Sequence, residues 1–72
     1  MSSSIYNSQS KRRRVRGVLN QGARGLNILT DAGELWVLDR DDVDPVLIGQ
    51  RVTAEGSLAG YDRLSVDWIG SA

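Results

Sequence analysis

Five cationic side chains lie within seven residues near the start of the chain, in the stretch Lys11-Arg12-Arg13-Arg14-Val15-Arg16-Gly17. The 72 residues contain nine Lys and Arg and nine Asp and Glu, so the formal net charge is zero. The charges are segregated, because residues 1–16 carry +5 and residues 17–72 carry −5. Clustered cations bind phosphate, so the stretch indicates contact with a nucleic acid. The alternative is a basic arm that solubilises the terminus or folds back onto the acidic remainder of the chain.

Other chemistry is poorly supported by the sequence. The acidic segment of residues 39–44 lacks the sharp-turn Gly and the distal Glu of a calcium-binding loop, which favours a solvated loop with helix-capping Asp. The chain has no Cys and no His, and its single Lys, Lys11, lies in the basic stretch, so Ser57 and Ser65 have no recognisable base. We therefore predict a non-enzyme without metal or cofactor.

The elements that must position the basic residues are mainly strands. Short apolar runs separated by Gly predict five strands at residues 14–21, 25–30, 34–39, 51–58 and 63–69. Residues 40–49 suit a short helix, with Asp42 or Asp44 as its cap, Pro45 at its first position and Gly49 at its end. Alternation predicts Val15, Gly17 and Leu19 inside the first strand and Leu64, Val66 and Trp68 inside the last. Residues 1–13 are polar and basic, which predicts a disordered arm ahead of a domain at residues 14–70.

The order of these elements, with a Gly partway along the first strand where a sheet bends sharply, is that of a five-stranded OB barrel. An SH3-like barrel, which usually lacks a helix at that place, is the main alternative. The segments at residues 15–19 (VRGVL), 29–38 (LTDAGELWVL), 49–58 (GQRVTAEGSL) and 64–69 (LSVDWI) resemble those of small bacterial OB-fold domains. The chain looks most like short, stand-alone bacterial OB-like proteins of unknown function, over residues 14–70.

The resemblance implies a ligand site across the second and third strands and between the loops that join strands one and two and strands four and five. Tyr61 is the best exposed stacking candidate, whereas Trp36 is either packed in the barrel or exposed, and Trp68 is expected in the core. The candidate nucleic-acid-binding residues are Lys11, Arg12, Arg13, Arg14, Arg16, Arg24, Asn27, Trp36, Arg51, Tyr61 and Arg63.

Two functions remain open at this point. A module that binds single-stranded DNA or RNA requires Arg24, Arg51 and Arg63 to converge on one face, because the rest of the domain is acidic. A protein-interaction or adaptor module would instead use an apolar strand face or a sheet edge to bind a partner protein or another copy. We expect a cytoplasmic protein with no membrane span and no small-molecule substrate.

Overall fold

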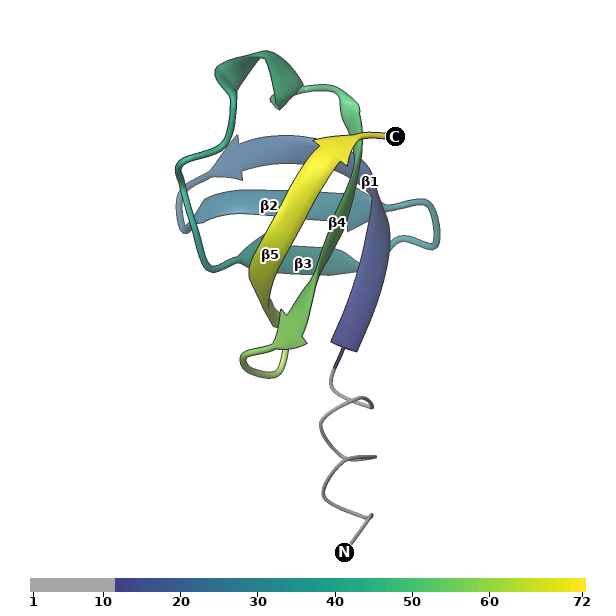
Figure 1. The fold of residues 1–72 in the computed structure, drawn as a ribbon, viewed down its shortest axis with the longest axis vertical. Helices are drawn as coiled ribbons and strands as arrows, with labels where there is room; N and C mark the ends of the chain where they lie inside the picture. Colours follow the sequence, from purple (N-terminus) through teal and green to yellow (C-terminus); the bar gives the residue numbers. More distant parts are fainter. Residues whose placement is uncertain (1–11) are drawn as a thin grey trace, which may run out of the picture.

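The computed structural model describes residues 12–72, which form five strands and one helical turn (Figure 1). The strands are β1 (Arg12–Gly22), β2 (Gly25–Thr30), β3 (Leu35–Leu38), β4 (Arg51–Leu58) and β5 (Arg63–Ser71). The predicted bounds of β2 and β4 are confirmed, and the other three strands lie where the sequence placed them, with shifted ends. Residues 1–11 of the predicted arm, including Lys11, lie outside the described residues, whereas Arg12 and Arg13 belong to β1.

The five strands close into a ring in the order β1-β2-β3-β5-β4. All neighbouring strands are antiparallel except β3 and β5, which pair in parallel through Val37 with Arg63 and Leu38 with Leu64. Gly33, with φ of +88°, allows the tight β2–β3 turn that the sequence predicted. The all-β prediction is therefore confirmed.

The predicted short helix is only one 3₁₀ turn, η1 (Pro45–Leu47). Asp44 caps it by accepting a hydrogen bond from the Val46 backbone N–H at 3.1 Å, and Pro45 takes the first position, as predicted. Gly49, with φ of +89°, follows almost at once, so there is no room for a second turn. Leu47 packs against the core, but Val46 is 70% exposed, so within the turn only Leu47 anchors it to the sheet.

The core fills the inside of the ring with aliphatic side chains. Its buried members are Val15, Leu19, Leu26, Ile28, Leu38, Val52, Ala54 and Leu64. Figure 1 shows β1 running beside β4 and then turning to lie beside β2. The turn occurs at Gly17, which pairs with Thr30 of β2 and with Val52 of β4. A Cβ atom at Gly17 would lie 2.0 Å from the Leu29 carbonyl oxygen, so this bend requires Gly.

A β-bulge in β5 overturns the prediction that Trp68 lies in the core. Glu55 pairs with Trp68 and the next residue, Gly56, pairs with Val66, so Asp67 is the additional residue. The bulge reverses the alternation: Leu64 is buried before it, and Ile69 packs against the core after it. Trp68 consequently lies on the outer face of the sheet, where its side chain is 51% exposed.

Candidate nucleic-acid interface

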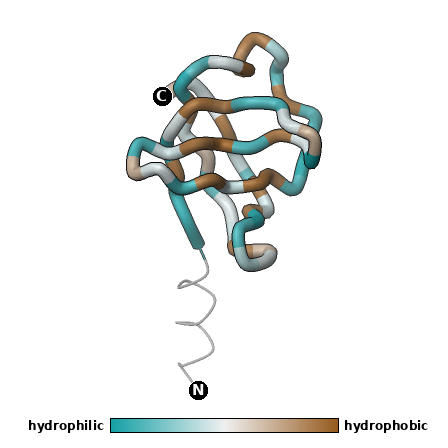
Figure 2. The backbone as a smooth tube through the Cα atoms, turned by 180° about the vertical axis from the view of Figure 1, so that it is seen from behind, coloured by the Kyte–Doolittle hydropathy of each residue, from teal (hydrophilic) through white to brown (hydrophobic). Residues whose placement is uncertain are grey.

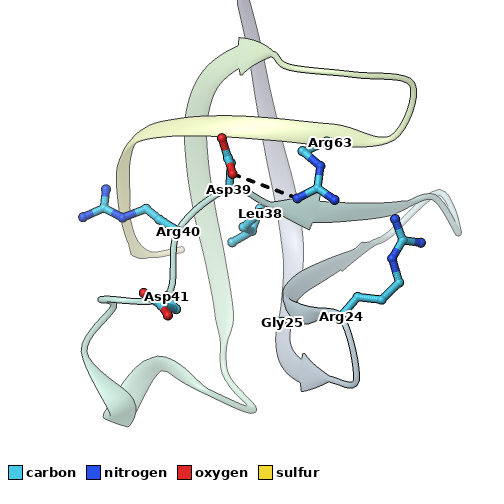
Figure 3. Close-up of a pocket in the computed structure, with 7 residues that line it drawn as sticks. All are labelled: Arg24, Gly25, Leu38, Asp39, Arg40, Asp41 and Arg63. Carbon is cyan, nitrogen blue, oxygen red and sulfur yellow. Dashed lines mark ion pairs between the residues drawn. The ribbon is translucent and has the colours of Figure 1, made fainter.

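Three loop and strand ends that are distant in sequence surround a pocket of about 320 Å³. The β1–β2 turn contributes Arg24, the segment after β3 contributes Asp39 to Asp41, and the first residue of β5 contributes Arg63. In Figure 3, Arg24 and Arg63 lie on one side of the pocket and Asp41 lies across from them, with Leu38 between. The structure therefore brings together two predicted site residues, Arg24 and Arg63, from the two ends of the domain.

The ion pairs of these two arginines are long. An Arg24 guanidinium nitrogen lies 3.9 Å from an Asp62 carboxylate oxygen, and an Arg63 nitrogen lies 4.0 Å from an Asp39 oxygen. Both distances exceed the 2.7–3.2 Å of a hydrogen bond. An anion that approached Arg24 or Arg63 could therefore form direct hydrogen bonds that the carboxylates do not form.

Arg40 also lines the pocket, but its guanidinium is held by the protein itself. Its Nε donates to Asp42 at 2.7 Å, and a terminal nitrogen donates to the Val66 carbonyl oxygen at 3.4 Å. The hydrogen bond with Asp42 raises the pKa of Arg40 and lowers the pKa of Asp42. Sequence reasoning did not select Arg40, since it lies within an acidic segment that indicated only a solvated loop.

The outer face of β2 and β3 adjoins this pocket. Asn27 pairs with Val37, which pairs in turn with Arg63, so these residues form one row across three strands. In the neighbouring row Leu29 pairs with Leu35, and the two side chains are 46% and 50% exposed. The face therefore carries Asn27 and Arg63 on either side of the buried Val37, next to an exposed apolar pair.

The aromatic candidates have different environments. Tyr61 is fully exposed in the β4–β5 loop, next to Asp62, which pairs with Arg24. Trp36 is partly buried and packs against the core, and its Nε1 is buried without a hydrogen-bond partner among residues 12–72. Of the two alternatives for Trp36, the structure favours the packed one, which leaves Tyr61 as the stacking candidate near the pocket.

Arg51 does not join Arg24 and Arg63. Its two terminal nitrogens each donate to one carboxylate oxygen of Asp31, both at 2.8 Å, so the pair is bidentate. These hydrogen bonds lower the pKa of Asp31 and raise that of Arg51. Asp31 follows β2 and Arg51 begins β4, so the pair ties the β2–β3 turn to β4. Of the three arginines whose convergence nucleic-acid binding requires, Arg24 and Arg63 line the pocket and Arg51 does not.

The basic stretch of β1 lies beside β4, and its first arginine reaches a residue of β5. Arg12 forms an ion pair with Asp67, and an Arg14 nitrogen lies 2.8 Å from a Glu55 oxygen. Arg16 donates to the Thr53 hydroxyl at 3.4 Å. Figure 2 shows the start of β1 as a hydrophilic segment, and Arg13 donates to the Arg12 carbonyl oxygen. The predicted alternative in which the basic residues pair with the acidic domain thus describes Arg12 and Arg14.

Comparison with known families complements this geometry. Residues 16–72 match the family model described as a protein of unknown function, DUF5818. The chain belongs to the DUF5818 family. The DUF5818 match begins within β1 and includes Arg24, Arg63 and Trp68, whereas Arg12 and Arg14 precede it. No curated protein and no solved structure matches the chain significantly.

Two further findings concern metal ligands and membrane-spanning helices in the described part of the DUF5818 domain. Between residues 12 and 72, no three His, Cys, Asp or Glu side chains are arranged so that they could hold a metal ion. Over the same residues there is no helix with the length and apolar character needed to cross a membrane.

Proposed function

We propose that this DUF5818 protein is a non-enzymatic, OB-like module that binds single-stranded DNA or RNA at the pocket formed by Arg24 and Arg63. The ring order β1-β2-β3-β5-β4, with a turn between β3 and β4, supports an OB-like barrel. The bend of β1 at Gly17, where the strand passes from β4 to β2, supports it further. A bacterial, cytoplasmic protein remains part of the proposal.

The observation that carries the proposal is the convergence of Arg24 and Arg63 at one pocket, with the fully exposed Tyr61 two residues before Arg63 in the chain. Single-strand binders combine cations for phosphate with aromatic rings for bases. Arg24 and Arg63 have side chains that are 64% and 40% exposed, and their ion pairs are longer than hydrogen bonds. The pocket also contains Asp39 and Asp41, so phosphate must be recognised by directed hydrogen bonds and not by net charge alone.

The test is a titration of a labelled single-stranded oligonucleotide and its duplex at low and at physiological salt. Arg24→Gln and Arg63→Gln should each weaken single-strand binding and reduce the salt slope by about 0.7 for every phosphate contact removed. Arg51→Gln is the matched control, because it also removes one exposed, paired guanidinium but lies outside the pocket. Tyr61→Ala should weaken binding by about 1–3 kcal/mol, and Tyr61→Phe should retain most of it. Absence of binding at low salt would overturn the proposal.

The exposed pair of Leu29 and Leu35 favours a second candidate function, a protein-interaction module. Two neighbouring leucines at about half exposure on a sheet face are a common element of protein interfaces. Association through them should survive high salt and should be lost in Leu29→Ser, which light scattering or a sedimentation experiment would detect if the partner is another copy. The salt dependence separates this function from the first.

A further inference from the structure

The outer face of β1, β4 and β5 carries a second set of residues suited to single-stranded nucleic acid. Arg14 pairs with Glu55, and Glu55 pairs with Trp68, so the arginine and the indole lie in one row across three strands. Strands are spaced about 4.8 Å apart, which places the two Cα atoms roughly 10 Å from each other. Arg16 and Thr53 begin the next row, which ends at Gly70.

The indole of Trp68 extends over Gly70 on this face. A Cβ atom at Gly70 would be 2.8 Å from Cζ2 of the Trp68 indole, so the six-membered ring rests on the Gly70 backbone. The absence of a side chain at Gly70 gives the ring this position, and the indole remains 51% exposed. An aromatic ring that is packed against the backbone and still half exposed is suited to stacking on a base.

The charge of this face differs from that of the rest of the domain. The first five residues of β1 carry four arginines, and the acidic residues whose charges interact with them or face them are Asp31, Glu55 and Asp67, which gives a net charge of +1. The remaining described residues have four arginines and six acidic side chains, a net charge of −2. A polyanion is therefore attracted to this face and repelled by most of the others.

The spacing of the arginines also fits a nucleic-acid backbone. Arg12, Arg14 and Arg16 are alternate residues of β1 and are all exposed. Alternate residues of a strand are about 6.7 Å apart, close to the roughly 6.8 Å spanned by two nucleotides of a stacked strand. The pairs of Arg12 with Asp67 and of Arg14 with Glu55 involve exposed side chains, and such pairs contribute little to stability. Phosphate can therefore displace these carboxylates.

We propose that the β1–β4–β5 face is a second single-strand contact surface, in which Trp68 stacks on a base while Arg14 and its neighbours on β1 bind phosphate. This inference rests on the proposed function but adds a surface on different strands from the Arg24–Arg63 pocket. It also assigns a binding role to Trp68, which the alternation of β5 had placed in the core.

The test uses the full chain and one single-stranded oligonucleotide at low salt, with a folded state confirmed for each variant by circular dichroism. Trp68→Ala should weaken binding about tenfold, equivalent to about 1.4 kcal/mol, and Trp68→Phe should recover most of the affinity. Arg14→Gln should reduce the salt slope by about 0.7, whereas Arg51→Gln, which removes a paired guanidinium elsewhere, should leave it unchanged. If the Trp68 and Arg14 variants bind a duplex as tightly as the wild type does, their loss of affinity is specific to single strands.

A direct readout avoids dependence on the folding of any variant. In a heteronuclear NMR titration of the wild type, the indole N–H signal of Trp68, assigned with Trp68→Phe, should shift with the oligonucleotide. The signal of Trp36, whose Nε1 is buried, should shift less. If the wild type binds and only the Arg24 and Arg63 variants lose affinity, with no shift at Trp68, the second surface is wrong while the proposed function stands. If the wild type does not bind any single strand, both are wrong.

Discussion

Substitution of Gly17 by Ala tests the physical reason for the bend in β1. The added Cβ would lie 2.0 Å from the Leu29 carbonyl oxygen and 2.7 Å from both the Leu29 carbonyl carbon and the Thr30 Cα. These are backbone atoms, so no side-chain rotation can relieve the contact. An ordinary contact of 3.4 Å would require the two strands to move apart by about 1.4 Å, which is incompatible with the hydrogen bonds between β1 and β2.

The loss of stability expected for Gly17→Ala follows from these displacements. Overpacking in a close-packed interior costs about 1–3 kcal/mol, and each lost ladder hydrogen bond adds roughly 1 kcal/mol. The total of about 3 kcal/mol or more is comparable to the whole stability expected for a domain of this size, roughly 3–9 kcal/mol. For a small domain each kcal/mol lowers Tm by about 4–8 °C, so Gly17→Ala should lower Tm by at least about 12 °C or abolish cooperative folding.

Thermal unfolding followed by circular dichroism measures this effect, with Gly60→Ala as the control. A Cβ at Gly60 would have its nearest neighbour, the Arg63 Cβ, at 3.6 Å, an ordinary contact. That variant should unfold within a few degrees of the wild type. A Tm for Gly17→Ala that also lies within about 3 °C of the wild type would refute the argument that the two strands approach each other too closely for any side chain.

Two further predictions concern the core and the exposed ion pairs. Leu64 is fully buried, so Leu64→Ala should lower the free energy of unfolding, measured in urea, by about 2–5 kcal/mol. Val46 is 70% exposed, so Val46→Ala should change it by about 0.5 kcal/mol or less. Equal effects of the two substitutions would contradict the assignment of the core. The hydrogen bonds from Arg51 lower the pKa of Asp31 below its ordinary value of 3.8, so the stabilisation is present above that pH and is lost as the pH falls through the lower, folded-state pKa. Unfolding curves between pH 5 and pH 2 should therefore show a steeper loss of stability for the wild type than for Asp31→Asn, and parallel curves would show that the pair is not formed in solution.

Most of the fold was predictable because its signals are local. The alternation of Val52, Ala54 and Gly56 identifies β4, and the left-handed Gly33 marks the β2–β3 turn. The longer β1 was predictable in position but not in length, because its first residues, Arg12 and Arg13, are exposed and carry no apolar alternation. The length of the helix was overestimated, because the capping signals at Asp44 and Pro45 mark where it begins but do not determine how many turns follow.

The candidate site was predictable only in part. Arg24 and Arg63 could be paired from the sequence because the resemblance to an OB barrel brings their loops together, and the pocket contains both. Arg51 could not be excluded, because its partner Asp31 is 20 residues away and becomes its neighbour only when the ring of strands closes. Trp68 was misplaced for a different reason: a bulge depends on the pairing of two strands, and the sequence of β5 alone does not reveal it.

The bulge at Asp67 changes which residues of β5 face the interior. Before it the even-numbered side chains, such as Leu64, point inward, and after it the odd-numbered ones, such as Ile69, do so. If β5 paired with β4 without the bulge, the alternation would run uninterrupted from Leu64 and turn the indole of Trp68 toward the interior, whereas deletion of Asp67 would remove the additional residue and leave Trp68 on the outer face. The surface chemistry of this face is therefore governed by how β5 pairs with β4 at one position as well as by the residues that the face carries.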